Sequence, residues 1–295
     1  MQTECWDDTR VVWLKNAQIC VAVAPELGGR VVSLRHRGRE REFLWRHPAL
    51  RLAPCPPGSA YDPHFYGGID EVMPCDIPEV LADIACPDHG ELWTTTLTAQ
   101  GSDQELSLRG TLPQYGLSYQ RGLRLEEHQL ICDYRIGNPT AENRPFIWKL
   151  HAALAVQPGD RMLCSADEAY VPDPAWSRRS SRLPFAWPTA DGVDFSVVPA
   201  PDGSTEFLVL QGLREGMMGL AAQDGARIEC RFDRKVFPCC WYFASHGALG
   251  GAYTAVLEPC TSPWLHVREA AAHGGGVCLG PEETLTTTVV WSVYA

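Results

Sequence analysis

The chain has 295 residues, enough for a large core, and its 45% hydrophobic and 21% charged residues are an ordinary globular composition. Its net charge of −11 argues against nucleic acid or an anionic membrane surface as a partner, because both would repel it. No stretch is apolar enough to span a membrane, and the acidic residues 1–8 do not resemble a signal peptide. We therefore expect a cytoplasmic protein.

Apolar and polar residues alternate in many short segments along the chain, which is typical of half-buried strands. Turn residues, supplied by 26 glycines and 23 prolines, recur about every ten residues, as in β-sandwiches. We predict an all-β fold, a single large antiparallel domain over residues 1–295. The expected strands are 18–24, 31–37, 107–112, 117–125, 130–136, 206–211, 218–222, 227–232, 241–245, 253–258 and 284–294.

Convincing helical patterns are scarce. Residues 78–85 are expected to form a short helix, because Pro78 suits a first helical turn, and residues 265–272 are ambiguous. Residues 50–69 and 171–194 are interpreted as long loops, and long loops on a rigid β scaffold often carry binding groups.

The twelve cysteines are scattered through the chain and include no Cys-x-x-Cys pair. Neither a disulfide scaffold nor a structural zinc site is expected, and free thiols, mostly buried, are the better interpretation. Cys75, Asp76, His64 and Asp70 lie near one another in sequence, but we do not favour a cation there and predict no metal site.

Residues 146–156 predict a strand with one apolar face and one polar face. Lys149 and His151 share the polar face, and Ala153 and Ala155 after them leave room. A titratable pair beside small residues is typical of a pocket floor, and a hydrogen-bonded core histidine is the equally weighted alternative. Trp148 lies on the other face and is expected in the core.

Two further segments carry polar groups. His89, Glu91 and Trp93 share one face if their segment is extended, and hydrogen-bonding groups beside an aromatic ring suit a polyol. The alternative is a turn histidine with an exposed glutamate. Glu258 ends an apolar strand just before Pro259, and a strand-end carboxylate in water is its alternative.

The sequence contains no nucleophile elbow, P-loop or dinucleotide-binding fingerprint. The candidate groups are histidines and carboxylates. They favour acid–base chemistry over a covalent intermediate.

Short motifs, in their order and spacing, resemble the galactose mutarotase-like family, which includes aldose 1-epimerases and hexose-6-phosphate mutarotases. The resemblance is spread over nearly the whole chain and implies a β-supersandwich. The matching segments are 25–34 (opening hairpin), 66–74 (Gly-Gly block), 88–90 (His-Gly block), 148–151 (catalytic histidine), 257–259 (catalytic glutamate) and 280–283 (turn before the last strand).

The resemblance implies an isomerase acting on a free sugar. Glu258 would be the general base at the anomeric hydroxyl, and His151 would be the general acid at the ring oxygen. The reaction that the resemblance implies requires no metal and no organic cofactor. The further candidates for substrate binding are His89, Glu91, Lys149, Asp70 and Trp93.

The chain departs from the hexose-6-phosphate branch, which has an arginine before the Gly-Gly block and another after the His-Gly block. Tyr66 and Trp93 stand in those places, so a phosphate would lose its bidentate partners. The expected partner is therefore an uncharged small-molecule carbohydrate, with aromatic rings stacking on it. Arg30 is either a substrate contact or a turn residue, and the turn is the favoured interpretation.

Two other functions are open. A non-catalytic sugar-binding protein would rely on aromatic residues such as Trp93, Trp148 and Trp241. Another carbohydrate-active enzyme, a lyase or an isomerase, would fit the same scaffold, since a fold does not determine a function. A lyase acting on uronates would need a basic cleft or a cation, and Lys149 alone supplies little of that.

Overall fold

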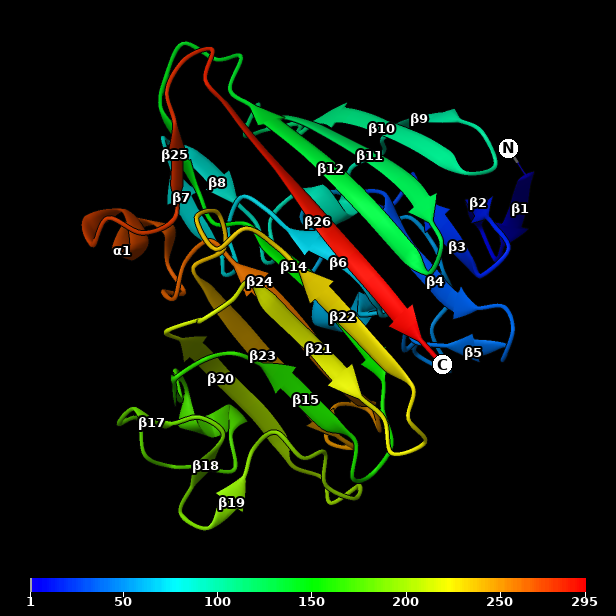
Figure 1. Cartoon of the computed structure of the whole chain (residues 1–295). Coiled ribbons are helices and arrows are strands. Elements are labelled where there is room, and N and C mark those ends of the chain that lie inside the picture. The colour runs from blue at the N-terminus through cyan, green and yellow to red at the C-terminus, as the bar shows by residue number, and fades with distance from the viewer. Residues whose placement is uncertain (1) are drawn as a thin grey trace.

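The protein is almost entirely β-structure, as its sequence predicts (Figure 1). The computed structural model describes residues 2–295, and its largest sheet has twelve strands. In spatial order they are β1 (Gln2–Trp6), β2 (Thr9–Lys15), β3 (Ile19–Ala24), β4 (Arg30–His36), β6 (Gly68–Val72), β14 (Lys149–Ala155), β24 (Tyr253–Cys260), β23 (Cys239–His246), β20 (Thr205–Gln211), β16 (Glu168–Tyr170) and β17 (Phe185–Ala186), with β5 (Arg41–Glu42) beside β4.

A second sheet has eight strands, and three two-stranded sheets complete the strand pairing. The eight are β15 (Arg161–Cys164), β21 (Met217–Ala221), β22 (Arg227–Arg231), β26 (Thr284–Tyr294), β12 (Gln129–Gly137), β11 (Ser118–Glu126), β10 (Glu105–Thr111) and β9 (Thr98–Gly101). The small sheets pair β7 (Glu79–Leu81) with β8 (Ile84–Cys86), β13 (Arg144–Phe146) with β25 (Val277–Leu279), and β18 (Thr189–Ala190) with β19 (Val193–Asp194).

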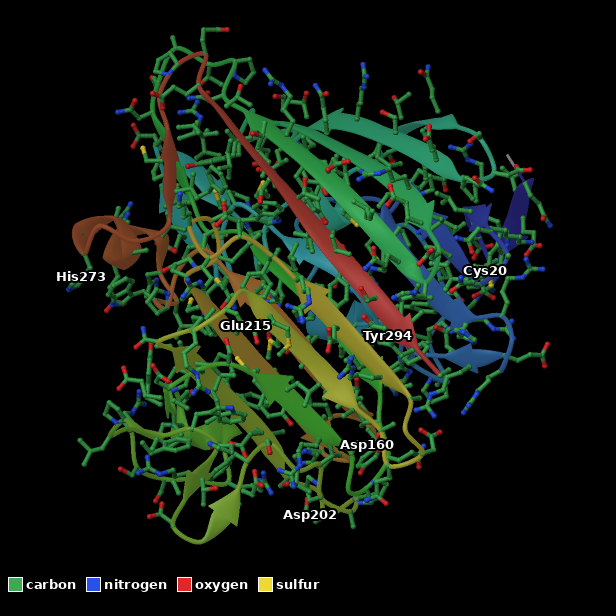
Figure 2. The ribbon with its side chains drawn as sticks, in the orientation of Figure 1. Cys20, Asp160, Asp202, Glu215, His273 and Tyr294 are labelled. Carbon is green, nitrogen blue, oxygen red and sulfur yellow. The ribbon has the colours of Figure 1, made fainter. Side chains whose placement is uncertain are left out.

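The eight-stranded sheet lies in front of the twelve-stranded sheet in Figure 1, and one hydrophobic cluster contains side chains from both. Each sheet contributes the apolar face of its alternating strands, as in other sheet-on-sheet packings. On β26, Val289, Trp291 and Val293 are buried. Figure 2 shows side chains filling the space between the sheets, with Glu215 and Asp160 at opposite ends of the β15–β21 pair.

The alternation predicted for residues 146–156 is confirmed on β14, where Leu150 and Leu154 belong to the core cluster, and this leaves Lys149, His151 and Ala153 on the opposite face of the sheet. It does not hold ahead of β14, where Ile147 is in the core cluster as well as Trp148. The functional candidates therefore lie on the face of the twelve-stranded sheet that is turned away from the second sheet.

A buried polar cluster ties β6 to the second sheet. The Glu71 carboxylate accepts hydrogen bonds from Arg121 at 2.7 Å, from the Tyr134 hydroxyl at 2.9 Å and from the Trp148 indole at 2.9 Å. A buried charge is stable only when it is paired and hydrogen-bonded, and these three donors meet that need. Because Glu71 points into the core, its neighbour Asp70 points to the candidate-site face.

The helix expected over residues 78–85 is wrong. The segment forms the β7–β8 hairpin, whose two turn residues, Ala82 and Asp83, have φ of 47° and 60°. Positive φ at both central positions is the geometry that matches the twist of a two-residue hairpin. The ambiguous segment 265–272 contains a short helix, α1 (Val267–Ala272), and single turns of 3₁₀ helix occur at η1 (Asp62–His64), η2 (Leu92–Thr94) and η3 (Pro174–Trp176).

All twelve cysteines are free and seven of them are buried, which confirms the interpretation made from their spacing. Buried thiols behave as small apolar side chains in such positions. Within residues 2–295, no helix has the length and apolar character needed to cross a membrane.

Candidate functional site

A row of side chains from four adjacent strands forms the floor of the candidate site. His151 on β14 pairs with Asp70 on β6, and Glu258 on β24 pairs with Trp241 on β23. The register of β14 and β24 places His151 opposite Glu258. In the next row, Ala153 follows on the same face of β14 but is fully buried and does not line the cavity, so it does not provide the room expected from sequence.

A cavity of about 280 Å³ opens above this row. Four predicted site residues line it, and three others, Asp70, Glu91 and Trp93, do not. The lining consists of Tyr61, Asp62, Phe65, Asp76, Ile77, His89, Lys149, His151, Trp176, Phe207, Phe243, Leu249 and Glu258.

His151 is held from behind by a carboxylate. Its Nδ1 lies 2.9 Å from Asp70 Oδ1 and 3.2 Å from the Tyr61 hydroxyl, and that hydroxyl donates to Asp70 Oδ2 at 2.6 Å. Burial by itself would raise the pKa of Asp70, but Arg30 and His151 lower it to about 2. An ionised Asp70 accepts the proton of Nδ1, so Nε2 is the ring nitrogen left for the cavity.

Arg30 is not the turn residue that its sequence position suggested. It is the first residue of β4, only 3% exposed, and its Nη2 lies 2.7 Å from Asp70 Oδ2. The guanidinium neutralises the buried carboxylate that holds His151. Asp70 is thus enclosed by Arg30, Tyr61 and His151, which explains why it does not reach the cavity.

Lys149 is buried beneath the cavity, between two carboxylates. Its Nζ lies 2.8 Å from Asp76 Oδ1 and 3.3 Å from Glu258 Oε2, and 3.7 Å from the centroid of the Trp241 ring. Burial alone would lower the pKa of Lys149, but the two carboxylates raise it above its usual range. Burial likewise acts to raise the pKa of Asp76, and Lys149 lowers it.

His89 also lines the cavity, at a turn where its φ is 56°, and its ring lies edge-on to that of His151 with centroids 5.9 Å apart. Its ring stacks on Tyr61 with centroids 3.9 Å apart, and its Nδ1 lies 3.0 Å from Asp88 Oδ1. Burial acts to lower the pKa of His89, but the carboxylates of Asp88 and Asp76 raise it. With Nδ1 bound to Asp88, Nε2 is free to face a ligand.

The predicted shared face of His89, Glu91 and Trp93 is wrong, because the chain turns at Gly90 and continues into η2 instead of extending. Glu91 accepts hydrogen bonds from the backbone N–H groups of residues 114 and 115 at 2.8 and 3.0 Å, which makes it a loop anchor. Trp93 is 3% exposed and packs edge-on against Tyr61. Neither side chain is placed to bind a sugar in this cavity.

Several residues of the site have no signal in the sequence. Tyr61 lies in the long loop 50–69, whose composition predicted a loop but not which side chain would bind. Asp76 follows β6 and reaches Lys149 only through tertiary packing. Trp176, Phe207 and Phe243 come from a loop and two strands far from β14 in sequence. Only the position of Trp176, in the loop 171–194, could have drawn attention to it.

Within residues 2–295, no three His, Cys, Asp or Glu side chains are grouped as they would be around a metal ion. The buried Lys149, Asp76 and Glu258 pair with one another instead. What the arrangement offers a ligand is two neighbouring imidazoles and the Glu258 carboxylate, suited to moving protons on a hydroxylated molecule.

No model of a protein family matches this sequence. Solved structures match it over almost its whole length. An inferred aldose 1-epimerase from Klebsiella pneumoniae has a TM-score of 0.77 and 12% identity, with 97% of this chain and 79% of that chain covered. A second inferred aldose 1-epimerase, from Escherichia coli K12, has a TM-score of 0.73 and 16% identity, covering 96% and 98%.

A galactose mutarotase-like protein from Lactobacillus casei has a TM-score of 0.72 and 12% identity, with 96% of this chain and 100% of that chain covered. At such identities the match concerns the backbone. The protein therefore has the galactose mutarotase-like fold, as the order of its sequence motifs predicted.

Proposed function

We propose that the protein is an isomerase of the aldose 1-epimerase type, a mutarotase that interconverts the anomers of an uncharged sugar. The observation that supports this most strongly is the placement of His151 opposite Glu258 on the floor of one cavity. The names of the similar structures, inferred aldose 1-epimerases and a galactose mutarotase-like protein, point to the same reaction.

The reaction needs one base and one acid within reach of two oxygens on the same carbon. Side chains directly opposite on neighbouring antiparallel strands have Cβ atoms about 5 Å apart, which suits that task. Glu258 accepts the proton of the anomeric hydroxyl, and the C1–O5 bond breaks as the aldehyde C=O forms. The electron pair of the broken bond stays on O5, which takes a proton from Nε2 of His151. The open aldehyde rotates about C1–C2, and the reverse steps close the ring on the other face.

His151 can act as the acid because its ring is held from behind. Asp70 binds Nδ1 and so directs Nε2 to the cavity, while Arg30 and Tyr61 hold Asp70 in place. Asp70 is a positioning residue in this mechanism, in place of the substrate contact expected from sequence. Arg30 is a positioning residue as well, because it binds Asp70, which in turn binds His151.

Lys149 is also a positioning residue. Its Nζ donates to Asp76 at 2.8 Å, forms an ion pair with Glu258 at 3.3 Å and lies over the Trp241 ring. The ammonium orients Glu258 through this ion pair, and His89 supplies the hydrogen bond to the substrate through Nε2.

The cavity suits an uncharged sugar. Among its described lining residues, Lys149 is the only lysine or arginine, and its charge is already balanced by two carboxylates. A phosphate or carboxylate on the substrate would find no unpaired lysine or arginine and would face Asp62, Asp76 and Glu258. A uronate lyase would meet the same repulsion.

The test is anomer exchange measured by NMR or polarimetry across a panel of monosaccharides. His151→Ala and Glu258→Gln are each expected to lower the catalysed rate roughly 10²–10⁴-fold, the range of a single acid or base. Equal rates for both variants and the wild type would refute the mechanism. Calorimetric binding of a sugar with no exchange would indicate the sugar-binding alternative, and an unsaturated product absorbing in the ultraviolet would indicate a lyase.

A further inference from the structure

The cavity has a second half that the acid–base chemistry does not use. Its wall is aromatic, formed by Trp176, Phe207 and Phe243. The Phe207 and Phe243 rings lie 6.2 Å apart, and Trp176 lies 6.4 Å from Phe243. The two phenylalanines are half-buried and Trp176 is 40% exposed, so the wall runs from the floor to the mouth.

This aromatic wall is continuous with the acid–base pair. Phe243 lies on β23, next to the strand of Glu258, and pairs directly with Phe207 on β20. Neighbouring strands are about 4.8 Å apart, so the distance from the strand of His151 to that of Phe207 is roughly 14 Å. A single pyranose ring with C1 between His151 and Glu258 is too short to cover it.

Trp176 is fixed over the wall by a buried anchor. The two residues after it bond to the carboxylate of Glu206, which is fully buried on β20 next to Phe207. Ser177 donates to one oxygen and Arg178 Nε to the other at 2.8 Å. Asp173 caps the η3 turn from its other end by accepting from the backbone N–H of residue 175 at 3.1 Å. The loop 171–194 thus presents its tryptophan in a set position.

We propose that this wall is a second sugar subsite, and that the preferred substrate is a reducing disaccharide; the proposal rests on the proposed function. Ring opening requires a free anomeric hydroxyl, so any extension must be attached at another hydroxyl of the reacting sugar. The second pyranose ring stacks its C–H face on Trp176, Phe207 and Phe243. Its hydroxyls stay in water at the mouth, where exposed Asp62 adds a hydrogen-bond acceptor.

The experiment compares each monosaccharide with disaccharides that have the same reducing-end sugar: glucose with maltose and isomaltose, and galactose with 4-O-β-galactosylgalactose. The wild type is expected to have the higher kcat/KM for a disaccharide of its preferred sugar. Trp176→Ala should lower the disaccharide-to-monosaccharide ratio of kcat/KM roughly three- to tenfold, mainly through KM, the loss expected for one stacking contact. Leu183→Ala is the control, because Leu183 is 72% exposed in the same loop and outside the cavity.

A ratio that is the same for wild type and Trp176→Ala would overturn the second subsite while leaving the mutarotase proposal intact. Failure of the proposed function would give a different result: His151→Ala would exchange the anomers of every sugar tested at the wild-type rate. In that event calorimetry with maltose and glucose decides the subsite: tighter maltose binding that depends on Trp176 supports it, and equal binding refutes it.

Discussion

Removing the buried ammonium of Lys149 should both destabilise the protein and change its pH dependence. Lys149→Met keeps an unbranched stem of similar length but takes away the charge shared by Asp76 and Glu258. At an effective dielectric constant of about 20, the contacts of 2.8 and 3.3 Å carry roughly 6 and 5 kcal/mol of gross Coulomb energy. The desolvation of the ammonium offsets much of this, and breaking a buried pair leaves a net loss of about 3–5 kcal/mol.

The loss of stability in Lys149→Met should become smaller as the pH falls. Lys149 lowers the pKa of Asp76, so the pair stabilises the fold above the unfolded pKa of an aspartate and loses that effect as the pH falls. In the variant, the unpaired Asp76 carboxylate is buried without its cation and is easier to protonate, so the difference in stability from wild type should shrink between pH 7 and pH 4.5.

Urea unfolding at pH 7 and at pH 4.5 measures these effects. Lys235→Met is the matched control, because Lys235 is exposed. The double variant Lys149→Met/Asp76→Asn should recover part of the stability, since it removes one of the two unpaired charges. A stability within about 1 kcal/mol of wild type at pH 7 would show that Lys149 does not balance these carboxylates.

Three further outcomes are expected. Asp70→Asn should slow anomer exchange and lower the free energy of unfolding by about 3–5 kcal/mol, because it leaves Arg30 unpaired. Adding Arg30→Met should restore the stability but not the activity. Recovered activity in the double variant would contradict the positioning role of Asp70. Asp70 has a pKa of about 2 in the folded protein and about 3.9 in the unfolded chain, so it should contribute roughly 2–3 kcal/mol to the free energy of unfolding above pH 4 and lose this as the pH falls through 2. In urea unfolding between pH 2 and 5, the free energy of unfolding of Asp70→Asn should therefore change less steeply with pH than that of wild type. Glu91→Gln should lower the stability by about 1–3 kcal/mol with an unchanged exchange rate; a slower rate at equal stability would return Glu91 to the substrate site.

The sequence predicted the fold class and most strands because alternation is a local property. Trp148 and Leu150 point into the core, so Lys149 and His151 had to share the other face of β14. The prediction of secondary structure failed in segments where apolar and polar residues do not alternate clearly. The segment 78–85 formed a hairpin through a turn with positive φ, and the chain near Gly90 turned where an extended strand was expected.

By itself, therefore, the sequence determined which face of each strand its side chains occupy, since successive residues alternate along any strand. The tertiary structure decided which strands are neighbours and in what register. The pairing of β14 with β6 and β24 brings Asp70, His151 and Glu258 into one row from segments about 80 to 190 residues apart. No local pattern encodes such pairings, and for the same reason the partners from loops, Tyr61 and Asp76, became visible only in the folded chain.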